Sequence, residues 1–325
     1  MSIPPYAANA VRCLAVKPGE HFQALVDEPF SGVGTRLCDA ALAAGAASAA
    51  SVVIPDSARP LTRAFEPFIA SLATTDAVCF WFSHIHDGEF AGFRKPLYAR
   101  ALETGARVAF GGRMDHSMLE HEMAADYEAL HELTGALAAR LAGSRRVRVT
   151  TPGGTDCAFD VTGREWKLDD GVLDQPGAFG NLPAGEVFVA PLATGADGVC
   201  VVDRSIALEG EGLVDEPIRL TFRHGRIASV EGGRSASATR AAIAEAGAGA
   251  DVVAELGIGT NERARITGSV ITDEKVLGTA HVAFGDNASP SYGGDNRAAI
   301  HVDGVMADAT IEVDGEIVFA LGALA

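Results

Sequence analysis

The sequence of 325 residues is poor in basic side chains and has no long apolar run. Its 26 lysines and arginines stand against 43 aspartates and glutamates, which gives a net charge of −17. Nucleic acids and anionic membrane surfaces attract basic proteins, so we expect neither as a partner. No segment approaches the roughly 20 apolar residues that a membrane-spanning helix needs. The N-terminal MSIPPYAANAVRC also lacks the basic and apolar regions of a signal peptide, so export is not expected.

Cysteine pairs and nucleotide-binding motifs are missing as well. The five cysteines are scattered and form no CxxC motif, which excludes a zinc ribbon and disfavours a disulfide framework. Such a set suits buried thiols in a reducing compartment, and we therefore expect a cytoplasmic protein. No GxGxxG motif or P-loop joins a strand to a helix, so a nucleotide site has no support. The cysteines are Cys13, Cys38, Cys79, Cys157 and Cys200.

The first 145 residues alternate between strand-like and helix-like segments. Apolar β-rich runs such as SVVIP and AVCFWFSH are separated by alanine-rich or amphipathic stretches, and a longer amphipathic helix is predicted from about Ser117 to Leu141. Alternating strands and helices are typical of a parallel sheet. The sequence thus predicts an α/β domain with a mostly parallel sheet over residues 1–145.

Beyond residue 145 the pattern changes to short strands and glycine turns. The dipeptides His224-Gly225 and Asp314-Gly315 lie between β-type runs, as hairpin turns do. One helix is predicted from about Ala236 to Ala246. Residues 146–325 are therefore predicted to form an α+β domain rich in antiparallel strands.

The block from Ala280 to Gly304 holds the strongest metal-binding candidates, His281, His301 and Asp303. A strand places alternate residues on one face, so His301 and Asp303 should point the same way. An imidazole beside a carboxylate suits a divalent metal. A single strand histidine is usually a satisfied core or surface residue, and HxD often arises by chance. Three such groups in one glycine- and asparagine-rich block are harder to explain without a ligand.

Two glutamates upstream carry weaker indications. Glu255 interrupts the apolar run VVAELGIG, where it is either a strand residue facing water or a carboxylate ligand at a strand end. Glu186 follows the turn Pro183–Gly185 and precedes a tight apolar run. From its local sequence alone, a solvated loop glutamate is the simpler interpretation.

His84 and His86 follow a buried strand of the first domain. Ligands of open α/β sheets gather at the carboxyl ends of strands. The segment could be a second metal site, a substrate-contacting loop or an ordinary polar loop. Its position at a strand end favours substrate contact, because no ligand geometry is fixed there.

Several segments in order along the C-terminal half together resemble a known family: GTDCAFDVTGR, GNLPAGEVFVAP, AELGIGTN, DEKVLGTAHVAFGDN and NRAAIHVDG. They are similar to the thermophilic-type metallo-aminopeptidases and their shorter, leucyl aminopeptidase-like bacterial relatives. The resemblance implies a cytoplasmic, homodimeric hydrolase that cleaves an N-terminal peptide bond or a related small amide. A water activated by two divalent ions, zinc, cobalt or manganese, would be the nucleophile.

The resemblance also implies roles for individual residues. It assigns the five metal ligands of the family to Glu186, Glu255, His281, His301 and Asp303. The family places a tyrosine after its first histidine, where it assists the oxyanion or the water. The nearest tyrosine here is Tyr292.

A second branch with the same fold, the 2,5-dihydroxypyridine dioxygenases, is similar too. It carries one Fe(II) on two histidines and an aspartate, of which His301 and Asp303 match and Glu255 does not. That branch also places a histidine near His84 or His86 as a base. The sequence hypothesis is therefore a metal-dependent hydrolase, in which Tyr292 or His86 assists proton transfer, with a mononuclear ring-cleaving dioxygenase as the alternative. A module that keeps the fold without catalysis is the third possibility.

Overall fold

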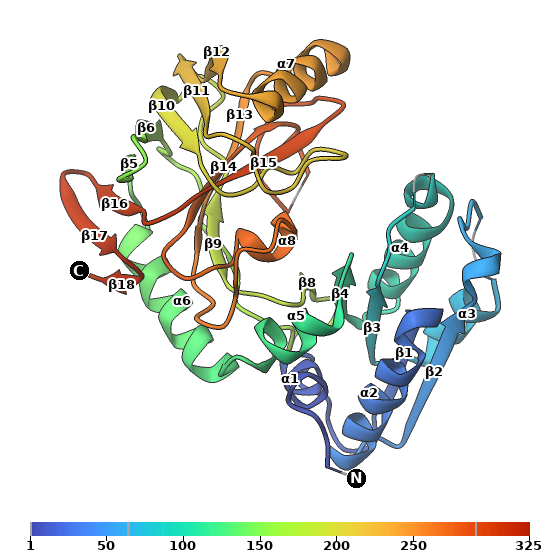
Figure 1. Ribbon diagram of the computed structural model, residues 1–325. Helices are drawn as coiled ribbons and strands as arrows, with labels where there is room; N and C mark the ends of the chain where they lie inside the picture. Colours follow the sequence, from blue (N-terminus) through green and yellow to red (C-terminus); the bar gives the residue numbers. More distant parts are fainter. Residues whose placement is uncertain (1, 64–65, 87, 290) are drawn as a thin grey trace. The chain divides into compact units, whose positions relative to one another are not determined.

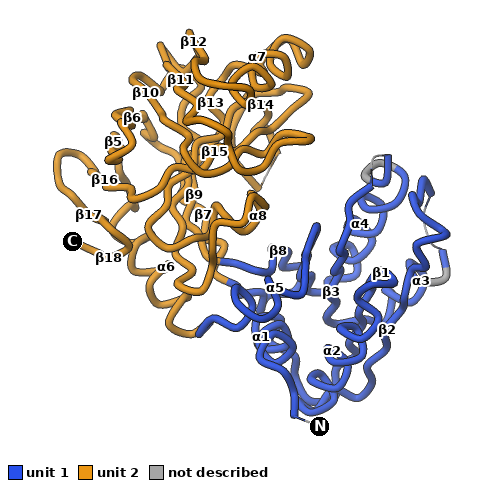
Figure 2. The backbone as a smooth tube through the Cα atoms, in the orientation of Figure 1, with its two compact units in different colours: residues 1–127, 171–184 blue, residues 128–170, 185–325 orange. Residues whose placement is uncertain are grey.

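The computed structural model describes residues 2–63, 66–86, 88–289 and 291–325. The chain forms two compact units (Figure 2). Unit 1 comprises residues 1–127 and 171–184, and unit 2 comprises residues 128–170 and 185–325. Each unit has its own sheet system.

Unit 1 is built on one five-stranded parallel sheet, in the order β2-β1-β3-β4-β8 (Figure 1). This confirms the predicted parallel α/β region. Its strands are β1 (His21–Asp27), β2 (Ser48–Ile54), β3 (Ala77–Phe82), β4 (Arg107–Gly112) and β8 (Phe179–Asn181). Its α-helices are α1 (Pro5–Cys13), α2 (Ser31–Ala43), α3 (Glu66–Ser71), α4 (Lys95–Glu103) and α5 (His116–Glu120).

Unit 2 holds two antiparallel sheets, which confirms the predicted antiparallel character of the second half. One has eight strands in the order β12-β11-β10-β6-β5-β16-β17-β18, and the other, called sheet C here, has the order β15-β14-β13-β9-β7. The eight-stranded sheet contains β5 (Arg146–Thr150), β6 (Asp156–Asp160), β10 (Ala196–Val202), β11 (Ile218–Arg223), β12 (Arg226–Glu231), β16 (Thr310–Val313), β17 (Glu316–Ala320) and β18 (Ala323–Leu324). Sheet C contains β7 (Lys167–Asp169), β9 (Glu186–Val189), β13 (Val253–Gly259), β14 (Ala280–Gly285) and β15 (His301–Met306). The helices are α6 (Tyr127–Leu141), α7 (Arg234–Ala246) and α8 (Val270–Asp273).

Both predicted hairpin turns are present. His224 and Gly225 have φ of 48° and 76° between β11 and β12, and Asp314 and Gly315 have φ of 49° and 100° between β16 and β17. Two positive φ values in a two-residue loop match the twist of the flanking strands. The predicted helix near Ala236–Ala246 is also present, as α7.

The units divide the chain differently from the predicted boundary at residue 145. Leu137 and Leu141 of α6 lie in the core of unit 2, so the helix goes with the residues that follow it. The segment 171–184 returns to unit 1, because β8 pairs with β4. A three-residue strand leaves no periodic pattern from which this return could be predicted.

The single helix predicted from Ser117 to Leu141 is wrong in its middle, where the chain leaves the helix between α5 and α6. The side-chain amide of Asn9 donates to the backbone oxygens of Met123 and Ala125, at 2.9 Å each. Ala125 itself is extended, with φ −60° and ψ 158°. A distant residue therefore takes the carbonyl groups that a continuous helix would use.

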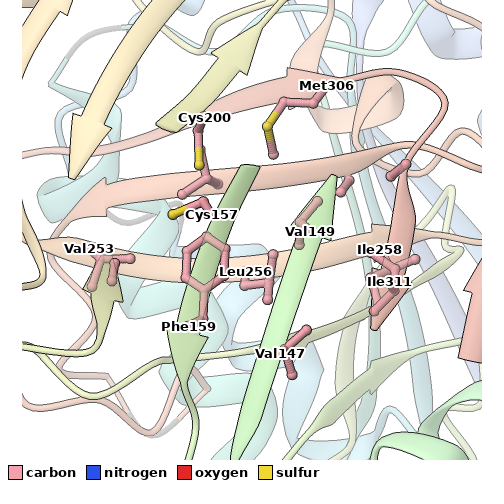
Figure 3. Close-up of a cluster of buried hydrophobic side chains, with 14 of the residues drawn as sticks. Val147, Val149, Cys157, Phe159, Cys200, Val253, Leu256, Ile258, Met306 and Ile311 are labelled. Carbon is pink, nitrogen blue, oxygen red and sulfur yellow. The ribbon is translucent and has the colours of Figure 1, made fainter. Parts of the chain in front are cut away.

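The core of unit 2 lies between its two sheets. Figure 3 shows Val147, Val149 and Phe159 of the eight-stranded sheet in one buried cluster with Leu256 and Ile258 of sheet C. Since strand residues alternate between faces, the other face of sheet C is free to carry polar groups.

The remaining sequence expectations concern thiols and membrane spans. None of the five cysteines forms a disulfide, and all but Cys38 are buried. None of the helices formed by the described residues is long and apolar enough to cross a membrane.

Candidate metal centre

The five predicted metal ligands lie on one face of sheet C. Glu186 comes from β9, Glu255 from β13, His281 from β14, and His301 and Asp303 from β15. Their neighbours in sequence point the other way, into the core, and include Val187, Leu256, Ala280, Val282 and Val302. Because strand residues alternate between faces, candidate ligand side chains from four adjacent strands lie on the same face of the sheet. That they bind metal stays a prediction.

His301 and Asp303 share a face of β15, as their spacing predicts. Nε2 of His301 lies 3.2 Å from Oδ1 of Asp303 and 3.4 Å from Oε2 of Glu255. Nδ1 of His301 is 2.7 Å from the backbone oxygen of Asp286, to which it donates its hydrogen. That bond leaves Nε2 of the neutral ring as a lone pair facing the carboxylates, which is how metal-binding histidines are commonly oriented.

A β-bulge sets the direction of Glu255. The pairing of β13 with β14 shifts between Val253 and Glu255. Val253 and Leu256 therefore both enter the core (Figure 3). Glu255, which is not part of that core, lies among the polar groups of the other face. The side-chain amide of Asn287 donates to the backbone oxygen of Ala254, at 2.9 Å. Bulges of this kind re-aim side chains beside functional sites.

His281 fits because its cross-strand partner has no side chain. Gly257 pairs with His281, and a Cβ on Gly257 would lie 2.0 Å from Cε1 of the imidazole. The ring is 1% exposed, and its Nε2 lies 3.4 Å from Oε1 of Glu255 and 3.5 Å from Oε2 of Glu186. The carboxylate of Glu255 therefore contacts both imidazoles.

Three charged residues of this cluster were not among the sequence candidates. Lys275 follows α8, is completely buried, and forms ion pairs with Glu186, with Asp169 at 2.9 Å and with Glu274 at 3.2 Å. Asp169 pairs with Glu186 across β7 and β9. The polar run Asp273–Lys275 gave no local sign of burial, because only the fold supplies its partners.

The donor set fits a divalent cation. Three groups of ligand atoms lie within 4.8 Å of one another: Glu255, His301 and Asp303; Glu186, Glu255 and His281; and Glu274, His281 and Asp303. Two buried atoms, Oε2 of Glu186 and Nδ1 of His281, have no hydrogen-bond partner. Lys275 forms ion pairs with three carboxylates here, Glu186, Asp169 and Glu274. Buried acids are costly without a cation beside them, and imidazole and carboxylate are ligand types that divalent metals accept.

The carboxylates shift the titration of both histidines. Burial alone would lower the pKa of His281, but Glu255, Glu186 and Glu274 raise it to about 9. Burial likewise opposes the charged form of His301, and Asp303 with Glu255 raises its pKa to about 12. Burial raises the pKa of Glu186 to about 7 despite Lys275. The site attracts positive charge strongly.

Tyr292 lies against the same cluster. Its ring stacks on His301, with centroids 4.6 Å apart and planes inclined by 26°, and it meets Phe188 edge-on at 6.1 Å. Burial raises the pKa of Tyr292, and the nearby carboxylates Glu255 and Asp303 raise it further. The phenol thus stays protonated beside the predicted ligands.

His84 and His86 belong to unit 1, just beyond the carboxyl end of β3. The hydroxyl of Ser83 lies 2.8 Å from Oδ2 of Asp27 and 2.8 Å from Nδ1 of His84. Oδ2 of Asp27 also lies 3.0 Å from Arg59. Ser83 therefore donates to Asp27 and accepts from Nδ1 of His84, which leaves Nε2 of the neutral His84 ring as a proton acceptor. The ring of His86 lies 6.3 Å from that of His84.

Two solved structures share the fold over nearly the whole chain. 2,5-Dihydroxypyridine dioxygenase from Pseudomonas putida KT2440 has a TM-score of 0.75 at 18% identity, covering 98% of this chain and 96% of that one. Wild-type AmpT from Thermus thermophilus has a TM-score of 0.71 at 18% identity, covering 99% and 98%. Both are distant in sequence, and what they establish is the fold.

The match to a family model is more specific. No curated protein sequence matches the chain. The model of NicX, 2,5-dihydroxypyridine 5,6-dioxygenase, matches residues 12–325. This favours the dioxygenase that the sequence hypothesis gave as its alternative over the aminopeptidase that it placed first. The chain belongs to the NicX family of 2,5-dihydroxypyridine 5,6-dioxygenases.

Proposed function

We propose that this protein is a metal-dependent dioxygenase that opens a small hydroxylated aromatic ring of the 2,5-dihydroxypyridine type. The observation that carries the proposal is the group of Glu255, His301 and Asp303, whose ligand atoms lie within 4.8 Å of one another on one face of sheet C. Its family membership supplies the reaction class.

The proposed reaction needs no external reductant. The bond between ring carbons 5 and 6 breaks, and both atoms of one dioxygen molecule end in the ring-opened product. A bound Fe(II) would supply the redox chemistry that lets dioxygen react with the ring. With His281 beside Glu255, the cluster offers two imidazoles as well as carboxylates, the donor types of non-haem iron oxygenases.

The chain's own residues orient the ligands. Asp286 fixes the tautomer of His301, and the stacked ring of Tyr292 covers one face of that imidazole. A role of His84 or His86 of unit 1 in proton transfer stays a prediction from the sequence.

The test is oxygen uptake by anaerobically purified protein loaded with Fe(II), after addition of 2,5-dihydroxypyridine. One mole of oxygen should be consumed per mole of ring lost. His301→Ala should reduce the rate at least about 100-fold, since it removes a ligand together with its orienting bond. His224→Ala, on an exposed hairpin of the same unit, is the matched control and should leave the rate unchanged. Absence of oxygen uptake by iron-loaded protein would refute the proposal for this substrate class.

A two-metal hydrolase is the second candidate, and one observation favours it. Glu255 belongs to two ligand groups, and the group that adds Glu186 and His281 resembles a carboxylate-bridged pair of metal sites. In that case about two zinc, cobalt or manganese ions per chain should accompany release of amine from aminoacyl amides and dipeptides, without oxygen uptake. Tyr292 would then assist the oxyanion or the water.

A further inference from the structure

We propose that the ammonium group of Lys275 takes the place of a second metal ion, so that the centre holds one divalent ion at Glu255, His301 and Asp303. The inference rests on the proposed function, because it presupposes a metal at that group. It explains how a chain with enough ligands for two metals can carry a one-metal site.

Lys275 is held like a cation in a carboxylate cage. Its side chain is 0% exposed, and Nζ contacts Glu186, Asp169 at 2.9 Å and Glu274 at 3.2 Å. The ammonium group donates a hydrogen bond to Glu186 and lies within ion-pair distance of Asp169 and Glu274. The backbone fixes the position too, since the oxygen of Lys275 accepts from the amide of Asn261 at 2.8 Å.

The ion pairs of Lys275 involve two of the three ligand groups and not the third. Glu186 belongs to the group with Glu255 and His281, and Glu274 belongs to the group with His281 and Asp303. In the remaining group, Glu255 with His301 and Asp303, neither carboxylate forms one of the ion pairs that the structure shows for Lys275. Two of the three possible sites thus already share a carboxylate with a fixed positive charge, and the third does not.

Coulomb repulsion from Lys275 makes a divalent ion less favourable at two of the three ligand groups. A divalent ion on Glu186 or Glu274 would share its ligand with the ammonium group inside a buried region, where like charges are poorly screened. Displacing Lys275 instead would leave a buried charge without partners, which is strongly unfavourable. The group of Glu255, His301 and Asp303 shares no ligand with Lys275, whose charge acts on Asp303 only beyond ion-pair distance.

The test counts the metal ions that bind to the whole protein. Apo-protein is titrated with Mn²⁺ alone, stoichiometry is read by calorimetry and metal analysis, and electron paramagnetic resonance distinguishes an isolated ion from a coupled pair. Wild type should bind one Mn²⁺ with the signal of an isolated ion. Lys275→Met, which keeps the length of the side chain and removes its charge, should bind two with a coupled signal. Adding Glu186→Gln should return the count to one.

Two further variants separate charge from folding. Lys275→Arg keeps a positive charge and should stay at one ion. Lys167→Met, a partly exposed lysine of β7 paired with Glu165, is the matched control and should also stay at one. If Lys275→Met does not fold, wild type still decides: two tightly bound Mn²⁺ ions per wild-type chain overturn the inference.

The inference and the proposed function fail in different ways. One ion in wild type and one in folded Lys275→Met would overturn the role of Lys275 and leave the metal centre standing. No bound Mn²⁺ in wild type would remove the metal centre, and the inference with it.

Discussion

At the scale of single residues, the site depends on the absence of a side chain at Gly257 as much as on the ligands. A Cβ there would overlap the imidazole of His281, its partner across β13 and β14. We therefore expect Gly257→Ala to push His281 from its place, to disturb Glu255, whose Oε1 lies 3.4 Å from the imidazole, and to weaken binding of a divalent metal by 10-fold or more. Equilibrium dialysis with Mn²⁺ measures the effect. Unchanged affinity would mean that His281 does not help to position Glu255.

The same substitution elsewhere in unit 2 controls for a general effect of alanine. Gly135 lies in α6 with no atom within 4 Å of the position of a Cβ. Gly135→Ala should raise stability by about 0.5–1 kcal/mol, because glycine is a poor helix former. Metal affinity should stay as in wild type, and urea unfolding checks the stability change.

Single residues of the site could be predicted from the sequence where residue type and spacing were informative on their own. The spacing of His301 and Asp303 was enough to predict that they share a face. Glu186 had no persuasive local pattern and rose only through resemblance to known motifs. Lys275 and Glu274 gave no sign at all, because a lysine becomes buried only when distant acids such as Asp169 surround it.

At the scale of elements, the bulge in β13 joins the core to the site. Asn287 holds it by donating to the backbone oxygen of Ala254, and its own oxygen accepts from the amide of Asn296 at 2.9 Å. Asn287→Ala leaves the buried backbone oxygen of Ala254 and the part-buried amide of Asn296 without these partners. We expect a loss of about 1–3 kcal/mol in stability, together with weaker metal binding, since Glu255 follows the bulge.

Urea unfolding and metal titration measure this pair of effects. Ser291→Ala, in the exposed part of the same loop, is the control and should change neither quantity. A loss of stability with intact metal affinity would show that the bulge does not orient Glu255.

The types of most elements could be predicted from their local sequence. The places where an element is interrupted could not. Hairpin turns at His224-Gly225 and Asp314-Gly315 could be predicted because glycine readily adopts the positive φ that two-residue hairpin loops require. The break before α6 could not, since Asn9 lies more than a hundred residues away. Strand β8 was equally hidden, being only three residues long.

At the scale of the whole molecule, the alternation of strands and helices predicted the parallel sheet of unit 1, and the short strands with glycine turns predicted the antiparallel sheets of unit 2. The extent of the units did not follow from that pattern, because α6 and the segment 171–184 are assigned by packing and pairing. The predicted ligands and the ion pairs of Lys275 all belong to unit 2, so removal of metal should act on that unit.

Removal of the metal by a chelator should therefore destabilise unit 2 and leave unit 1 unchanged. A ligand at 100 times its dissociation constant stabilises the folded state by about 2.7 kcal/mol. Treatment with a chelator should speed hydrogen exchange of amides in β13, β14 and β15, and leave those in β1 and β3 unchanged. Equal loss of protection in both units would place the metal-linked stability elsewhere. Hydrogen-exchange mass spectrometry resolves the two outcomes.

The central claim is that one face of sheet C binds a divalent metal. Anomalous diffraction from crystals grown with Mn²⁺ tests it most directly, because the ion itself is located. We expect one strong peak in contact with Glu255, His301 and Asp303. A map without a peak on this face of sheet C, or with an ion bound by none of these residues, would contradict it.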